Sequence, residues 1–157
     1  GCQAPCMGYV LDAGKSRGAG AAARRAGLKD VSFRCGDAAD HSGSSDTIVL
    51  LDVLHYLSPA QQQALLERLA RNDSAVIIRN GLRNGSWRYR MTLLEEYWTR
   101  WSGWIPSRAP IHFPTHEAIL RPFRELGRAG EARPLWGATP FSSHLFVFAP
   151  TSLPQPA

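Results

Sequence analysis

The stretch "TIVLLDVLHYLSPAQQQALLERL" at residues 47–69 predicts a strand, a short turn and a helix in immediate succession. Residues 47–52 are apolar on both alternating faces, which is typical of a strand buried between layers of helices. Ser58 is a natural N-cap, Pro59 fits the first helical position, and Gln61 completes a capping box. The inward stripe of this helix is expected to consist of Leu65, Leu66 and Leu69.

The same alternation of strands and helices continues on both sides of this stretch. Before it, the pattern predicts a strand at 8–12, a helix at 16–28 capped by Gly27, and a strand at 31–33. After it, the pattern predicts a strand at 74–80, an aromatic helix within 87–104, a helix near 115–126, and strands near 131–136 and at 143–149. Such an order is typical of a parallel sheet with crossover helices.

Composition indicates an ordinary globular chain. Of its 157 residues, 44% are hydrophobic and 20% are charged, which suits one domain with a real core. The net charge of +5 comes from scattered arginines, so we expect non-specific surface charge and no nucleic acid partner. Three cysteines without metal-type pairing, no leader segment and no apolar run of about 20 residues predict a cytoplasmic protein without a transmembrane segment.

Two acidic residues follow the first two predicted strands. In doubly wound sheets such strand ends point into the crevice where ligands bind. Asp12 could accept both hydroxyls of a ribose, and Asp37, one helix and one strand later, could accept from an adenine amino group. Together they indicate an adenosine-like ligand. The alternative is that each is a solvated turn or a helix-capping aspartate.

The turn between residues 51 and 58 is a third candidate site. Asp52 ends the buried strand, and His55 and Tyr56 precede the capped helix. The imidazole of His55 could act as a general base for a hydroxyl, with Tyr56 positioning the acceptor. Alternatively, both rings simply pack under a cofactor or under the following helix.

These segments resemble class I S-adenosylmethionine-dependent methyltransferases. The likeness rests on "VLDAGKSRGAGAAARRAGLKDVSFRCGDAAD" (10–40), "DTIVLLDVLHYLSPAQQQALLERL" (46–69) and "SAVIIRNG" (74–81). It implies that Asp12 holds the ribose, that Asp37 with Ala38 holds the adenine, and that Asp52 with Val53 lies along the methionine end. The full set of cofactor-binding residues expected is Asp12, Ala13, Gly36, Asp37, Ala38, Leu51, Asp52 and Val53, and no metal is expected.

A narrower likeness joins "LDVLHYL" (51–57) to "GATPFSSHLFVFA" (137–149). Both are similar to methyltransferases encoded with aryl-polyene and xanthomonadin-type pigment pathways. This likeness implies secondary metabolism and methyl transfer to a small molecule, such as a hydroxyl of an aromatic or polyene-type metabolite.

The chain departs from the family at its start. The family begins with a strand, a glycine-rich loop and a helix before the ribose acid, whereas only eleven residues precede Asp12. A rival alignment takes the first predicted strand as the family's first, with Gly14, Gly18 and Gly20 as the loop. We therefore expect an α/β, Rossmann-like, doubly wound and mostly parallel sheet that is truncated at the N-terminus and has an antiparallel last strand. This domain would span residues 1–150, with a disordered tail at 151–157.

Two further features have several interpretations. His112 and His116 are four residues apart, but Pro114 lies between them and no third ligand is evident. The aromatic and arginine-rich segment at 87–104 could line a flat substrate pocket, pack on the sheet, or touch a membrane or a partner.

Three hypotheses of function follow. The first is an enzyme that transfers a methyl group from S-adenosylmethionine, with His55 and Tyr56 as catalytic residues. The second is a truncated or degenerate domain without activity that acts as a partner subunit, because a missing central strand would leave sheet edges for a homo-oligomer or another chain to cover. The third, a nucleotide-binding oxidoreductase, lacks a well-placed GxGxxG motif.

Overall fold

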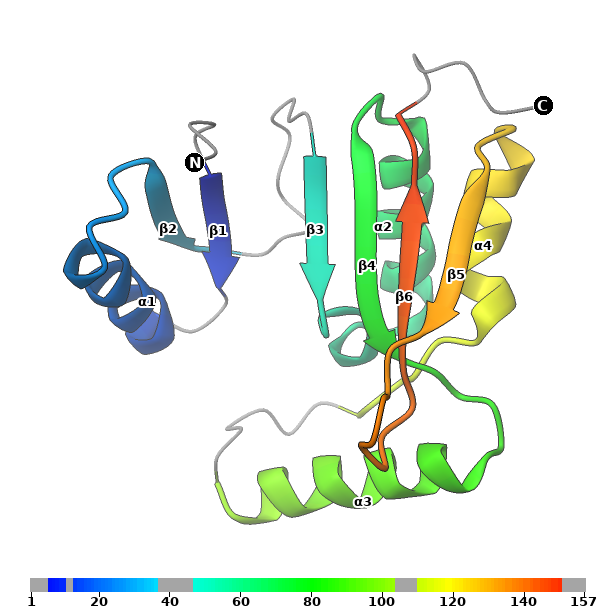
Figure 1. Cartoon of the computed structure of the whole chain (residues 1–157). Helices are drawn as coiled ribbons and strands as arrows, with labels where there is room; N and C mark the ends of the chain where they lie inside the picture. The colour runs from blue at the N-terminus through cyan, green and yellow to red at the C-terminus, as the bar shows by residue number, and fades with distance from the viewer. Residues whose placement is uncertain (1–5, 11–12, 37–46, 104–109, 151–157) are drawn as a thin grey trace. The chain divides into compact units, whose positions relative to one another are not determined.

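The computed structural model describes residues 6–10, 13–36, 47–103 and 110–150 (Figure 1). The chain divides into two compact units. The N-terminal unit comprises residues 1–43 and the C-terminal unit residues 44–157. Each is described separately below.

The N-terminal unit contains one strand-helix-strand motif. Strand β1 (Cys6–Val10) is followed by helix α1 (Ala13–Arg25) and strand β2 (Val31–Cys35). The two strands are parallel neighbours, and Val10 lies opposite Cys35. The predicted order is confirmed, and α1 begins three residues earlier than expected.

Helix α1 ends as the sequence predicts. Gly27 has a φ of 72°, and its amide donates to the Arg24 carbonyl while the Leu28 amide donates to the Ala23 carbonyl. These are the two bonds of a Schellman cap. The rival alignment assigns Gly14, Gly18 and Gly20 to the glycine-rich loop, whereas in the structure all three are helical residues of α1.

The C-terminal unit is a four-stranded sheet with helices. Its elements in chain order are β3 (Thr47–Leu51), the short 3-10 helix η2 (Leu54–Tyr56), α2 (Pro59–Arg71), β4 (Ala75–Gly81), α3 (Trp87–Trp101), α4 (His116–Glu125), β5 (Gly130–Pro134) and β6 (Ser143–Phe148). The strand order is β3-β4-β6-β5. Strands β3 and β4 are parallel, whereas β6 is antiparallel to both of its neighbours. The predicted Rossmann-like α/β fold with an antiparallel last strand is confirmed.

Helix α2 forms as its end signals predict. Ser58 and Gln61 make both bonds of the capping box, and Pro59 is the first helical residue. The inward stripe is buried as expected. Helices α2 and α4 pack on the same face of the sheet (Figure 1). The core between them and the sheet contains the stacked rings of Phe123 and Phe148, whose centroids are 3.6 Å apart.

The face of the sheet away from α2 and α4 is more exposed at β3 than the sequence predicts. Strand β3 was expected to be buried on both faces, but Val49 is 53% exposed and Leu51 is 58% exposed, whereas Leu50 is buried. The expectation is wrong for this face because α2 and α4 both pack on the face to which Leu50 belongs. None of the helices in the described part of the chain is long and apolar enough to cross a membrane.

A buried arginine closes the amino-terminal end of β4. Gly127 ends α4 with a φ of 70°, and the next residue, Arg128, is only 3% exposed. The terminal nitrogens of Arg128 donate to five backbone carbonyls, those of Leu69, Ala70, Asn72, Ser74 and Ala149. This one side chain therefore joins the end of α2 to the start of β4 and the end of β6.

Candidate functional site

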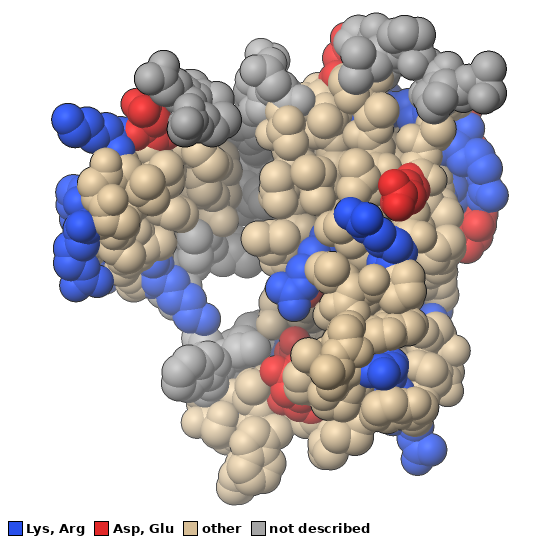
Figure 2. Space-filling model, in the orientation of Figure 1, with Lys and Arg blue, Asp and Glu red and all other residues tan. Residues whose placement is uncertain are grey.

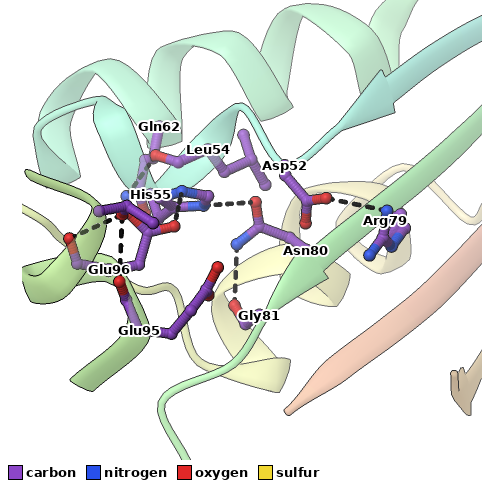
Figure 3. A network of polar contacts seen from close by, with 10 residues as sticks. Asp52, Leu54, His55, Gln62, Arg79, Asn80, Gly81, Glu95 and Glu96 are labelled. Carbon is purple, nitrogen blue, oxygen red and sulfur yellow. Dashed lines mark hydrogen bonds and ion pairs between the residues drawn. The ribbon is translucent and has the colours of Figure 1, made fainter. Parts of the chain in front are cut away.

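The carboxyl ends of β3 and β4 hold the candidate site of the C-terminal unit. Directly after β3, Asp52 has a φ of 53°, a left-handed conformation that aspartate tolerates better than most residues. Its amide donates to the Arg79 carbonyl at 2.9 Å, and its Oδ2 lies 3.1 Å from Nη1 of Arg79 (Figure 3). The backbone and the side chain of Asp52 are thus both fixed beside the edge of β4.

Hydrogen bonds from residues outside the turn stabilise the turn that follows Asp52. The side-chain amide of Gln62, on α2, donates to the carbonyls of Leu54 at 2.9 Å, of Leu57 at 3.1 Å and of His112. The His112 amide in turn donates to the His55 carbonyl at 2.9 Å. Because buried carbonyls cost free energy when unpaired, these bonds fix the conformation of η2.

His55 lies inside the unit and is 2% exposed. Its Nδ1 is 3.3 Å from Oδ1 of Asn80, and its Nε2 is 3.2 Å from Oε1 of Glu96 on α3 (Figure 3). The imidazole stacks on Phe113, with ring centroids 4.9 Å apart, and contacts the ring of Tyr56. Both ring nitrogens therefore face protein atoms.

The His55–Glu96 contact is close but lacks the geometry of a hydrogen bond. His55 Nε2 and Glu96 Oε2 are both buried without a hydrogen-bond partner. The pair attracts strongly only when the imidazole is protonated. By contrast, the side-chain amide of Asn80 has a hydrogen-bond partner, because its Nδ2 donates to the Gly81 carbonyl at 2.8 Å.

Phe113 explains why a glycine follows Asn80. A Cβ on Gly81 would lie 3.2 Å from Cδ1 of Phe113 and 2.8 Å from its Cε1, and the second distance is closer than real contacts allow. The ring that stacks on His55 therefore packs directly on the backbone at the end of β4.

Acidic groups accumulate at this end of the sheet. Burial raises the pKa of Asp52, and Glu96 raises it further, although Arg79 and His55 lower it. Burial, Glu96 and Asp52 raise the pKa of Glu95, which extends from α3 toward Asp52 and Asn80 (Figure 3). Burial and the carboxylates raise the pKa of Tyr56 to about 12. In all three groups burial is the largest cause and neighbouring carboxylates add to it, so the site disfavours further negative charge.

The predicted site residues fall in both units. Asp12, Asp37 and Ala38 lie outside the described residues. Ala13 is the first residue of α1, and Gly36 directly follows β2, in the N-terminal unit. In the C-terminal unit the structure brings together the remaining predicted residues, which are Leu51, Asp52, Val53, His55 and Tyr56.

Sequence reasoning missed the partners of His55. Asn80 follows Arg79 at the polar end of a strand that begins with four apolar residues, a signal that could have indicated a site at the strand end. Glu96 and Gln62 carry no such signal, because each looks like an ordinary polar residue of an amphipathic helix.

The two histidines considered as a metal pair have separate surroundings. The backbone of His112 supports η2, whereas the ring of His116 packs against Phe146 with centroids 5.4 Å apart. The described residues contain no group of three histidine, cysteine, aspartate or glutamate side chains that could hold a metal ion.

Solved structures of methyltransferases are similar to this chain. Magnesium protoporphyrin IX methyltransferase from Synechocystis PCC 6803 with bound S-adenosylhomocysteine matches with a TM-score of 0.67 and 19% identity, over 91% of this chain and 63% of that one. Geranyl diphosphate methyltransferase in complex with S-adenosylmethionine matches with a TM-score of 0.69 and 11% identity, over 94% and 69%. The chain has the methyltransferase fold.

The fold alone does not decide the reaction. The [4+2]-cyclase SpnF also matches, with a TM-score of 0.61 and 12% identity, over 90% of this chain and 64% of that one. The chain thus spans about two thirds of the length of these three proteins. No model of a protein family and no curated protein sequence matches the chain.

Proposed function

We propose that this chain is the cofactor-binding part of an S-adenosylmethionine-dependent methyltransferase that acts on a small molecule. The observation that carries the proposal is the acidic cluster formed by Asp52, Glu95 and Glu96 at the carboxyl ends of β3 and β4. In open α/β sheets, ligands bind outside the carboxyl ends of the strands. The similarity to methyltransferase folds supports the same location.

The chemistry of the cluster fits the methionine end of the cofactor. S-adenosylmethionine supplies an electrophilic methyl group on a positively charged sulfur, and its amino group is also a cation. Burial is the main cause of the raised pKa values of Asp52 and Glu95, and neighbouring carboxylates raise them further, so a bound cation would stabilise their ionised forms. Val53 would lie along the same part of the cofactor, with Leu51 before it. The ribose and the adenine are assigned to Asp12 and to Asp37 with Ala38, flanked by Ala13 and Gly36.

Burial supports a packing role for His55 over a role as general base. A general base must come within hydrogen-bond distance of the proton that it removes. His55 is 2% exposed, its Nδ1 faces Asn80, and its Nε2 faces Glu96. We therefore propose that His55 positions the turn and α3. Tyr56 is half-buried and, with a pKa raised to about 12, would donate a hydrogen bond to an acceptor hydroxyl at neutral pH.

For the acceptor we propose an aromatic or polyene-type metabolite with a hydroxyl group. Its support is helix α3, which lies beside the carboxyl ends of β3 and β4, where the methyl donor would bind (Figure 1). On the inner side of this helix, Tyr89 packs edge-on against Phe113 with ring centroids 5.8 Å apart. This assignment would place the protein in secondary metabolism. The alternative is a partner subunit without activity. Assays of cofactor binding and of methyl transfer on the same preparation distinguish it from an enzyme, because a partner subunit would give no methyl transfer.

Isothermal titration with S-adenosylhomocysteine tests the cofactor proposal. We expect saturable 1:1 binding to the 157-residue chain. The substitution Asp52→Asn removes one carboxylate of the cluster at a half-exposed position, so it should weaken binding at least about tenfold. Its cost in folding stability should stay below about 1 kcal/mol, because the ion pair with Arg79 is solvent-exposed.

Asp73→Asn is the matched control. Asp73 is an exposed aspartate at the opposite end of the same sheet, before β4. Its removal should leave the dissociation constant unchanged. Equal affinity of the wild type and Asp52→Asn would refute the assignment of Asp52, and the absence of any binding would refute the function for this chain.

A further inference from the structure

Helix α3 carries an apolar stripe on the side that faces away from the sheet. The stripe consists of Trp87, Met91, Leu94, Trp98 and Trp101, which are between 37% and 80% exposed. Their spacing of four, three, four and three residues places them on one face of the helix. The opposite face is buried, where Thr92 accepts a hydrogen bond from the Ser142 amide at 2.9 Å and Glu96 contacts His55.

The residue types in the stripe suit the boundary between hydrocarbon and water. Three of its five residues are tryptophan, and the adjacent Tyr97 is 63% exposed. Indole and phenol rings combine an apolar body with a polar tip, so they are enriched at the level of lipid headgroups. Trp98 and Trp101 pack against each other with centroids 5.3 Å apart and present a continuous aromatic surface.

The stripe is flanked on α3 by two arginines and by one exposed glutamate, Glu95. Arg90 is exposed beside it, and the guanidinium of Arg88 lies 4.7 Å from the ring centroid of Trp87. Figure 2 shows mainly uncharged side chains over α3, with acidic side chains gathered on the side nearer to β3. The whole chain carries a net charge of +5. Arginines beside an apolar helix face are attracted to anionic lipids.

We propose that the α3 stripe docks the protein on the surface of an anionic phospholipid bilayer, with α3 lying in the plane of the interface. The inference does not depend on methyl transfer. It accounts for the exposed tryptophans, for the flanking arginines and for the buried face opposite the stripe, which fixes the orientation of the helix on the unit.

A second copy of the chain fits the stripe less well. Helix α3 has 15 residues, about two heptads, whereas coiled coils are sustained over three or four. Tryptophan at three of five seam positions does not form the knobs-into-holes packing that branched aliphatic residues provide. The five stripe residues and Tyr97 are also few compared with the roughly 20 to 30 residues on each side of a stable interface.

Co-sedimentation of the full chain with large unilamellar vesicles tests the proposal. One set of vesicles contains only phosphatidylcholine, and the other contains about one third phosphatidylglycerol. We expect stronger binding to the second set, a blue shift of tryptophan emission on binding, and weaker binding as the salt concentration rises. Replacing both Trp98→Ser and Trp101→Ser should lower the partition coefficient at least about tenfold.

The double variant Leu28→Ser with Leu135→Ser is the matched control. Leu28 and Leu135 are also exposed apolar residues, but they lie outside α3. Binding of this control should stay within about twofold of the wild type. The proposal is overturned if neither set of vesicles sediments the wild type, or if both double variants lose binding equally. It is also overturned if ultracentrifugation without lipid shows a dimer that only the tryptophan substitutions dissociate.

Discussion

Buried polar groups surround both ends of strand β4, but the amino-terminal end has more hydrogen bonds. At the amino-terminal end, Arg128 donates to five carbonyls, and only its Nε lacks a partner. At the carboxyl-terminal end, His55 Nε2 and Glu96 Oε2 are buried without hydrogen bonds, and burial raises the pKa of Asp52 nearby. The first arrangement stabilises the fold, whereas the second lies beside Asp52, a half-exposed carboxylate that a ligand could reach.

The largest effect is expected from Arg128→Met. The substitution keeps the bulk of the side chain but leaves five carbonyls without their donor, so the free energy of unfolding should fall by about 3 kcal/mol or more. Urea denaturation measures this change. The control Arg133→Met removes an exposed arginine of β5 and should change stability by less than about 0.5 kcal/mol. Similar losses for the two variants would contradict the structural role of Arg128.

A smaller loss is expected from Gln62→Met, at the other end of β4. Gln62 donates to three carbonyls around η2, so its replacement should cost about 1 to 2 kcal/mol and should also loosen the turn that carries His55. Gln63→Met is the neighbouring control, because Gln63 bonds only to side chains near the surface, those of Glu67 and Arg121. Hydrogen exchange of the His55 and Tyr56 amides should increase in the Gln62 variant alone.

The smallest change in the free energy of unfolding is expected from Glu95→Gln, which should stabilise the protein and not destabilise it. A carboxyl group whose pKa is raised on folding destabilises the folded state above that pKa, and this cost disappears as pH falls toward the unfolded value near 4.5. The variant should therefore be slightly more stable than the wild type at pH 7, by at most about 0.5 kcal/mol at this exposed position. The two proteins should converge in stability at about pH 4. A variant that is less stable at pH 7 would show that the acidic cluster is not repulsive.

Local signals predicted the elements of the fold well, because helix ends and strand periods are encoded by neighbouring residues. The capping box at Ser58 and the Schellman cap at Gly27 are examples. Exposure of one face of β3 could not be predicted in this way, because it depends on which helices pack on the sheet. The same limit applies to the candidate site. His55 was identified by its position after a buried strand, but Asn80 lies 25 residues away and Glu96 comes from another helix.

The role of Arg128 is an extreme case of this limit. Its carbonyl partners in α2 and before β4 lie more than 50 residues away in sequence, and its own neighbours give no sign that it is buried. Only the assembled sheet brings these groups together.

The central claim is that ligand binding belongs to the carboxyl-terminal end of β4 and not to its amino-terminal end. Amide chemical shifts of isotope-labelled protein, recorded while S-adenosylhomocysteine is added, test it directly. We predict that the largest shifts within the C-terminal unit occur at residues 51–56 and at Asn80 and Gly81, with little change at Asn72, Ser74 and Arg128. Shifts concentrated around Arg128, or no shifts at saturating ligand, would contradict the claim.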